Sequence, residues 1–513
     1  MLNNLRPFGA PDCEADLAIL GEDGYSRYYF QATYFNRQSL DPSVYLIVGR
    51  RGAGKTALAR FFSFQNLLKG SIEIYIDQPS SFYETISKVV NQTTFNRDLQ
   101  IPQLTQTWEY IIWSAIFHQL KTRDIRIGAA CTVNGNGGIS KIIRLLMQSL
   151  LEKYLGSGRD LSDELDKMIN STVFETAKEA VLDLAKTNPI IIAVDTLEKY
   201  SARDDTLMTT TAALVEFASK FSMQYAPANI HIKVFAMGEI FPYLTEEYVS
   251  NPLKYVRNEV YLHWRPKDLM RMICWRLFQY LRVHHNASLR TSDIDWKSYR
   301  DVREKVWKPH FGDYLENGSL VDEETFPYVL RHTQLRPRQM IVLCNAIAER
   351  ALKYGNFPRF FSRDIMSGIQ NVQDSLADEV FNAYSSAYPN AARIAEALSG
   401  ISPIFEAKEL DKRAPRTSSQ WTDGYSPYRF REFITELGIV GRVRSRSQGY
   451  IEADFEYATR GRLTIATEDE CVIHPMFYTK LNVKASHKTR IYPFPDHQEF
   501  KTLGHTLTMS RQS

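Results

Sequence analysis

The feature that most constrains this chain is an octapeptide, Gly-Arg-Arg-Gly-Ala-Gly-Lys-Thr, at residues 49–56. It matches the pattern G-x-x-x-x-G-K-[ST], in which glycines let backbone N–H groups turn inward around a phosphate group. A β-branched and aromatic run at 44–48 precedes it, and a helical pattern begins at Thr56. A phosphate loop requires this passage from a strand into a helix, because the helix N-terminus attracts anions. We therefore interpret residues 49–56 as a phosphate-binding loop.

The loop and the residue after it are the candidate nucleotide ligands: Gly49, Arg50, Arg51, Gly52, Ala53, Gly54, Lys55, Thr56 and Ala57. Lys55 is expected to bridge the β- and γ-phosphates, and Thr56 to place its hydroxyl on Mg²⁺. A phosphate loop also needs a carboxylate at the end of a second strand, which holds the metal through water. Asp195, after the apolar run 189–194, is that candidate.

Four further residues are candidates whose roles are less direct. Thr196 follows Asp195 directly, so Glu198 is the nearest acid that could orient the attacking water, and it could equally hold the loop. Glu239 stands where a polar sensor of the γ-phosphate would sit, but a carboxylate repels phosphate, so we interpret it as structural. Arg336 and Arg338 flank a proline at a helix start; they either reach back to the γ-phosphate or lie at a solvated helix end.

The order of patterns predicts an α/β fold with a mostly parallel sheet covered by helices. Strand-like runs at 44–48, 72–77, 190–194, 231–236 and 259–262 alternate with helical ones. From residue 266 the pattern becomes helical, and beyond 380 short helices precede alternating strands. The predicted division is an N-terminal segment packing on the core (1–40), a phosphate-loop core (41–265), a helical lid (266–378), a winged-helix-like domain (379–485) and a tail (486–513).

Basic residues gather near the C-terminus. Between residues 411 and 446, eight Lys and Arg face four acids, a local charge of +4. A helix followed by an arginine-bearing hairpin is typical of a winged helix whose helix enters a DNA groove while its wing touches phosphates. Alternate residues of a strand share a face, so the last three candidates below should lie together. The candidate DNA contacts are Arg429, Arg431, Arg442, Arg444 and Arg446, and the alternative is a winged helix for protein contacts with solvated arginines.

Composition excludes several classes. The 62 Lys and Arg against 59 Asp and Glu give a net charge of +3, so attraction to nucleic acid or an anionic membrane must be local. The longest apolar runs fall far short of the ~20 residues of a membrane span, and the N-terminus lacks a secretory pattern. The five cysteines are dispersed and predict reduced thiols. We expect a cytoplasmic protein without membrane contact, folded as roughly three domains.

On these residues the chain resembles prokaryotic P-loop ATPases of the additional-strand class, and within it the STAND, KAP and origin-recognition-like AAA+ groups. The resemblance is clearest at 44–57 and 190–198 and suggestive at 262–269 and 335–341. Residues 46–58 also look like stand-alone bacterial ATPases carried near mobile elements and anti-phage defence loci.

The resemblance implies ATP and Mg²⁺ as cofactors, a homo-oligomer, and a regulatory ATPase that couples nucleotide state to assembly with double-stranded DNA or an effector protein. It departs from hexameric motors because no glutamate stands beside Asp195. Two alternatives remain: a DNA-stimulated motor or transposition-type ATPase, and a nucleotide-locked scaffold with negligible turnover.

Overall fold

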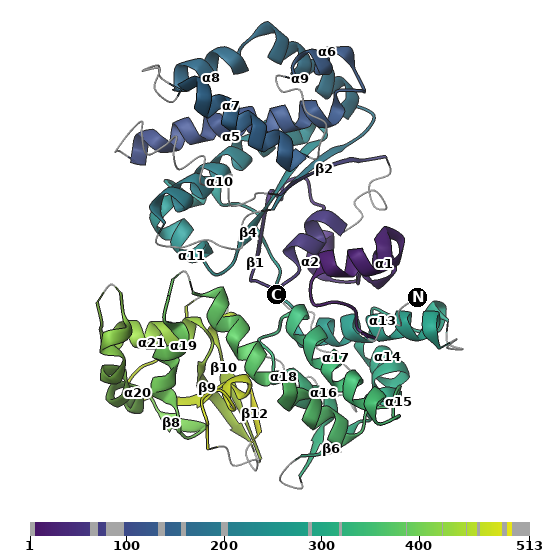
Figure 1. Ribbon diagram of the computed structural model, residues 1–513, viewed down its shortest axis with the longest axis vertical. Coiled ribbons are helices and arrows are strands. Elements are labelled where there is room, and N and C mark those ends of the chain that lie inside the picture. Colours follow the sequence, from purple (N-terminus) through teal and green to yellow (C-terminus); the bar gives the residue numbers. More distant parts are fainter. Residues whose placement is uncertain are drawn as a thin grey trace, which may run out of the picture. The chain divides into compact units, whose positions relative to one another are not determined.

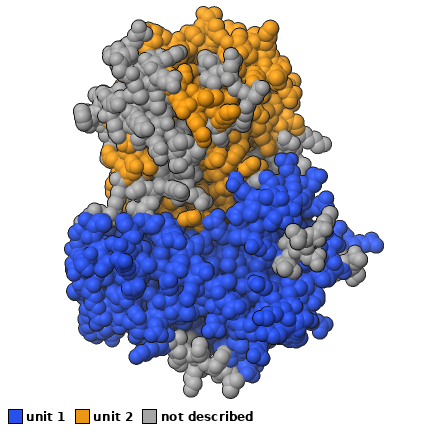
Figure 2. Space-filling view, in the orientation of Figure 1, with its two compact units in different colours: residues 1–32, 263–513 blue, residues 33–262 orange. Residues whose placement is uncertain are grey.

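The chain folds into two compact units, shown in different colours in Figure 2. The phosphate-loop unit comprises Thr33–Leu262, and the C-terminal unit comprises Met1–Ala32 together with His263–Ser513. The computed structural model describes residues 6–61, 70–77, 97–131, 139–154, 161–195, 204–285, 290–317, 321–385, 387–422, 424–447, 449–458, 462–484 and 490–494.

A five-stranded parallel sheet forms the centre of the phosphate-loop unit (Figure 1). Its strands, in spatial order, are β2 (Ile72–Asp77), β3 (Ile190–Asp195), β4 (Ile230–Met237), β1 (Leu46–Gly49) and β5 (Val260–Tyr261). Strand β4 lies between the strand that leads into the phosphate loop and the strand that ends at Asp195. This inserted strand defines the additional-strand class of P-loop folds, as the resemblance implied. Every residue of β3 and β4 is buried; β3 accordingly reads as a continuous apolar run up to Asp195, whereas β4 contains the buried polar residues His231 and Lys233.

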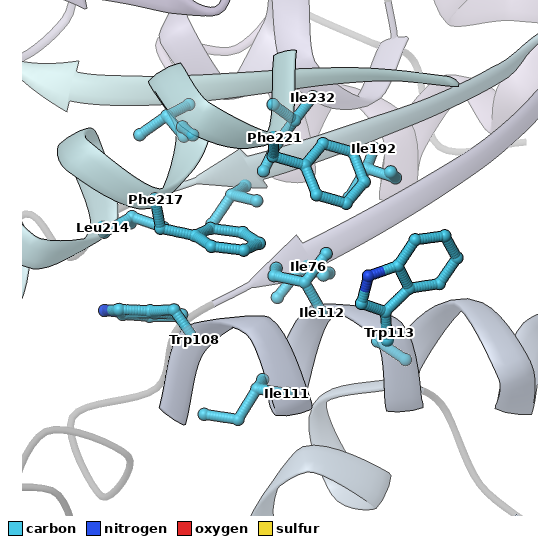
Figure 3. Close-up of a cluster of buried hydrophobic side chains, with 14 of the residues drawn as sticks. Ile76, Trp108, Ile111, Ile112, Trp113, Ile192, Leu214, Phe217, Phe221 and Ile232 are labelled. Carbon is cyan, nitrogen blue, oxygen red and sulfur yellow. The ribbon is translucent and has the colours of Figure 1, made fainter. Parts of the chain in front are cut away.

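Helices cover this sheet (Figure 1). They are α2 (Tyr34–Gln38), η1 (Ala57–Phe61), α5 (Arg97–Leu120), α6 (Ile125–Ala129), α7 (Ile139–Tyr154), α8 (Leu161–Ile169), α9 (Thr172–Ala185), α10 (Asp205–Tyr225), η2 (Ala226–Ala228), α11 (Phe241–Tyr243), η3 (Leu244–Tyr248) and α12 (Pro252–Tyr255). In the core, Trp113 of α5 and Phe221 of α10 meet strand residues such as Ile192 (Figure 3). Burial of aromatic side chains of this size gives the helices their stabilisation against the sheet.

The helical part of the C-terminal unit follows β5. Its elements are α13 (Pro266–His284), η4 (Thr291–Asp293), α14 (Tyr299–Val302), η5 (Arg303–Trp307), α15 (Lys308–Phe311), α16 (Thr325–Leu330), α17 (Pro337–Lys353) and α18 (Ser362–Ala383). An antiparallel hairpin of β6 (Tyr314–Glu316) and β7 (Asp322–Glu324) interrupts the helices, which the sequence pattern did not predict. These strands have three residues each, too short to show an alternation.

A winged-helix-like part ends the described chain. Its helices are α19 (Ala391–Ala395), η6 (Glu396–Leu398), α20 (Lys408–Arg413), η7 (Ala414–Gln420), α21 (Pro427–Glu436), η8 (Glu456–Ala458) and η9 (Pro475–Phe477). Its sheet has the order β12 (Arg490–Tyr492), β10 (Tyr450–Asp454), β9 (Val440–Ser447), β11 (Glu470–Ile473) and β8 (Ile404–Glu406). Helix α21 leads into the β9–β10 hairpin, and its residues Phe430, Phe433 and Ile434 are fully buried.

Three predicted boundaries differ from the structure. Residues 1–32, which include α1 (Cys13–Tyr28), belong to the C-terminal unit and not to the core, because Asp16 of α1 is buried in an ion pair of 2.8 Å with Arg276 of α13. Helix α18 continues past the boundary placed at residue 378. Strand β12 pairs in parallel with β10, so the sheet extends into the segment predicted as a tail.

Two smaller observations complete the architecture. Among the described residues, no helix combines the length and the apolar character that a bilayer crossing needs. All five cysteines are free; Cys274, Cys344 and Cys471 are buried, whereas Cys13 and Cys131 are only half-buried.

Candidate functional site

The phosphate loop turns sharply between β1 and the helix that begins at Lys55. Gly52 and Gly54 have φ of +79° and +97°, values that L side chains rarely adopt. The loop is closed by a hydrogen bond of 3.0 Å from the Ala53 amide to the Arg50 carbonyl. The helix starts within the motif, with the Leu58 amide donating to Gly54. The glycines of the motif are therefore required by the backbone path itself.

Lys55 lies over this loop. Its Nζ donates to the carbonyl of Gly49 at 2.9 Å and to that of Arg50 at 3.4 Å, and only 4% of the residue is exposed. A buried ammonium held only by neutral carbonyls can exchange them for a stronger acceptor, and a phosphate group is such an acceptor because it forms charge-assisted bonds. The geometry suits the role predicted for Lys55.

Thr56 and Asp195 lie together, although 139 positions separate them in the chain. The Thr56 hydroxyl donates to Oδ2 of Asp195 at 2.8 Å, and Asp195 is 7% exposed. Parallel strands end at the same edge of a sheet, so β1 and β3 deliver both residues to one place. Two oxygen ligands of this kind fit Mg²⁺, which prefers oxygen donors.

Tyr75 of β2 is a member of the site that the sequence analysis missed. Its hydroxyl donates to Oδ2 of Asp195 at 3.3 Å. Burial, and then the nearby Asp195 carboxylate, raise the pKa of Tyr75 well above its ordinary value, so the phenol remains a donor. Tyr75 lies in register with Ala193 in the β2–β3 pair, two residues before the pair Asp77 and Asp195. The alternation of residues 72–77 could have placed Tyr75 on the Asp195 side of the sheet, but not in contact with it.

Glu239 holds the phosphate loop from the end of β4. Its Oε1 accepts from the Arg51 amide at 2.8 Å and lies 4.0 Å from Nε of Arg50, and its side chain is 2% exposed. The preceding Gly238 is closely packed, since a Cβ there would lie 3.1 Å from the Arg50 nitrogen. The carboxylate that sequence analysis assigned a structural role therefore contacts the loop directly.

The remaining nucleotide-site candidates are not brought to the loop by any described contact. Glu198 lies outside the described residues. Arg336 and Arg338 belong to the C-terminal unit, where Arg336 is 1% exposed and donates to Gln334 at 3.1 Å. Arg338 contacts Pro11 and Glu379 of the same unit. Neither arginine lies at a solvated helix end, and their coupling to nucleotide remains a prediction.

The arginines predicted to bind DNA make contacts inside the winged-helix-like part. Arg431 forms a bidentate pair with Asp411, at 3.1 and 2.7 Å, and its side chain is 17% exposed. Arg429 donates to the Gly424 carbonyl at 2.8 Å and lies 5.6 Å from the centre of the Trp421 ring. Helix α21 thus presents no solvated pair of arginines.

The wing arginines are also engaged. Arg444 pairs with Glu452 at 3.2 Å and with Asp454 at 3.5 Å. Arg446 forms a two-point pair with Glu470, whose second contact has a distance of 2.9 Å. Arg442 donates to the Thr464 carbonyl at 3.4 Å.

The prediction that Arg442, Arg444 and Arg446 share one face is wrong. The register of β9 against β10 shifts between Glu452 and Ala453, which inserts one extra residue into β9 at Arg444. Such a bulge reverses the alternation beyond it. Arg442 therefore faces the side of Glu452 and Asp454, whereas Arg446 faces the opposite side, where it meets Glu470.

No family model matches the chain, and no curated protein matches it. Among solved structures it is similar to the ORC1 protein of Aeropyrum pernix in complex with DNA, at 13% identity and a TM-score of 0.33, over 89% of this chain and 94% of that chain. It is also similar to the ORC2 protein of the same organism in ADPNP–ADP complexes, at 11% identity and a TM-score of 0.33, over 78% and 81%. Likeness this low carries no argument, and the fold assignment stands on the strand order.

Proposed function

We propose that this protein is an ATP-binding, Mg²⁺-dependent P-loop ATPase that acts as a regulatory switch. One observation carries the proposal: the Thr56 hydroxyl and the Asp195 carboxylate meet at 2.8 Å beside a glycine-turned loop that Lys55 covers. The additional-strand order of the sheet supports it, because this order places the two metal-binding residues at one edge. The choice of ATP over other nucleoside triphosphates is supported only by the sequence resemblance.

Each residue has a separate task in the proposed reaction. Lys55 exchanges its carbonyl partners for phosphate oxygens, and Thr56 and Asp195 hold the metal. Bound Mg²⁺ would supply neutralisation of charge on the phosphates. Glu198 orients the attacking water, and Arg336 or Arg338 transmits nucleotide state to the C-terminal unit. Tyr75 orients the Asp195 carboxylate through its hydrogen bond.

The proposed output is assembly with DNA or an effector protein through the winged-helix-like part. The layout of α21 followed by the β9–β10 hairpin supports a DNA contact. A homo-oligomer and a role in phage defence belong to the same proposal and are supported by the sequence resemblance alone.

The deciding experiment is a turnover assay on the purified chain, with and without double-stranded DNA, beside mass measurement in ADP and ATP. A switch is expected to turn over slowly and to change its assembly state between the two nucleotides. Strong stimulation by DNA with ring or filament formation would favour a motor instead. Tightly copurifying nucleotide with negligible turnover would favour a scaffold. Absence of heat on titration with Mg²⁺–ATP would end the proposal.

A variant series tests Glu198 within that assay. Glu198→Gln is expected to leave ATP affinity unchanged and to slow turnover by about a hundredfold, in the range typical of a lost general base. Glu175→Gln is the matched control, because Glu175 lies on α9 and forms an ion pair with Lys178. Equal turnover in the two variants would remove Glu198 from the mechanism.

A further inference from the structure

A pocket of about 340 Å³ opens in the winged-helix-like part. It lies among α19, η6 and η7 and is lined by Arg393, Glu396, Ala397, Arg416, Thr417 and Gln420. Its volume falls at the lower end of the range of small-ligand sites. A pocket of this size accepts a phosphate group with part of the molecule that carries it.

The charges that line this pocket are not balanced. Arg393 and Arg416 are exposed, and neither makes a hydrogen bond or ion pair with any residue that the structure describes. Glu396 is the one carboxylate in the lining. Arg413 adds a third guanidinium nearby: burial, and then the charge of Arg416, lower the pKa of Arg413. Unpaired arginines in one pocket attract an anion.

The walls of the pocket are held in place by hydrogen bonds to backbone carbonyls and to a hydroxyl. Arg413 donates to the carbonyls of Ala397 at 2.9 Å and Ser399 at 3.1 Å, which ties α20 to η6. Thr417 is 1% exposed and accepts from Nε1 of Trp421 at 2.8 Å, and Asn390 donates to the Gln420 carbonyl at 2.8 Å. A pocket fixed before binding loses less conformational entropy when a ligand enters.

We propose that the Arg393–Arg416 pocket binds a phosphate group. Guanidinium groups match phosphate oxygens in pairs, and the pocket offers two whose donors are not already used by described carboxylates. The phosphate of a DNA backbone and that of a free nucleotide share this chemistry. The exposure of both arginines and their position in the winged-helix-like part favour DNA as the source, and this second step rests on the proposed function.

The test compares two double variants of the full chain. Arg393→Gln/Arg416→Gln removes the pocket charges, and the control Arg303→Gln/Lys308→Gln removes the same charge from the helical part of the C-terminal unit, where Asp313 already pairs with both residues. Binding of a fluorescent DNA duplex is measured over a range of salt concentrations. The pocket variant is expected to bind about tenfold more weakly and to lower the salt slope by about one, the value for one lost phosphate contact. The control variant is expected to change both much less.

A second arm separates the sources of phosphate. Pyrophosphate binding is measured by calorimetry in Lys55→Ala protein, so that the phosphate loop does not contribute, with and without the pocket substitutions. Loss of pyrophosphate binding with unchanged DNA binding keeps the pocket and assigns it to a small phosphate ligand. Unchanged binding of both probes overturns the proposal. Wild-type protein that binds no Mg²⁺–ATP refutes the proposed function while the pyrophosphate arm still decides the pocket.

Discussion

The phosphate loop and the wing are two regions whose function was predicted from short sequence patterns. The contacts that their predicted residues make are different in kind. At the loop, Thr56 and Asp195 are joined by a hydrogen bond of 2.8 Å. At the wing, Arg444 and Arg446 are held by carboxylates on opposite sides of a bulged strand. One pattern yields an assembled site and the other yields arginines already paired within the protein.

The difference lies in what each pattern specifies. The glycines and Lys55 set a backbone path, and that path fixes the direction of every group in the loop. A run of alternating arginines specifies only charge. Whether that charge faces solvent depends on carboxylates such as Glu470, which arrive from other strands.

The largest expected effect is at Lys55. Lys55→Ala should weaken Mg²⁺–ATP binding about a hundredfold, because two charge-assisted bonds of about 1.5 kcal/mol each are lost. Calorimetry measures the change. Lys186→Ala is the control, since Lys186 carries the same charge just before β3 and hence at the opposite edge of the sheet. Similar Mg²⁺–ATP affinities in the two variants would show that Lys55 does not bind the nucleotide, and the loop would then be no more a functional site than the wing.

The second-largest effect is expected for Asp195→Asn. Loss of the carboxylate is expected to raise the Mg²⁺ concentration for half-maximal turnover by about ten- to a hundredfold, as for other residues that hold a metal through water. The measurement is turnover against Mg²⁺ at saturating ATP. Asp183→Asn, an exposed partner of Lys186, should leave the Mg²⁺ curve in place. A parallel shift in both would show that general charge, and not the Thr56–Asp195 pair, sets metal affinity.

Glu239 should show a smaller, diagnostic effect. Glu239→Gln keeps an acceptor for the Arg51 amide but removes the charge, whereas Glu239→Ala removes both. ATP affinity is therefore expected to be about fivefold higher in Glu239→Gln than in Glu239→Ala, which corresponds to one hydrogen bond of about 1 kcal/mol. Equal affinities would mean that the carboxylate does not position the loop.

The smallest effect is expected at the wing itself. Glu470→Gln frees Arg446 from its ion pair, so DNA binding should strengthen about two- to threefold at low salt, because exposed ion pairs contribute little. Fluorescence anisotropy with a DNA duplex measures it. Glu468→Gln removes the same charge two residues away and is the control. A weaker affinity for DNA in Glu470→Gln would show that the pair supports the wing rather than masking it.

The sheet and the loop could be predicted because their signals are local. Residues 72–77 read correctly as β2, and the helical pattern predicted from residue 266 onward is confirmed in α17, since burial on one face leaves a periodic trace. Two contacts of the site could not be predicted: the hydrogen bond of Tyr75 to Asp195, and that of the Arg51 amide to Glu239. Each joins segments more than a hundred positions apart in the chain. The bulge at Arg444 leaves no mark in composition or period.

The phosphate-loop unit is inserted into the other unit, since the chain enters it after Ala32 and leaves it at Leu262. Two peptide connections therefore join the units, and a single proteolytic cut in one connection would not separate the two units. The inserted unit can be excised as a single stretch of polypeptide, residues 33–262. The C-terminal unit would stay intact after this excision only if Ala32 were joined to His263, because helix α1 is an integral part of that unit.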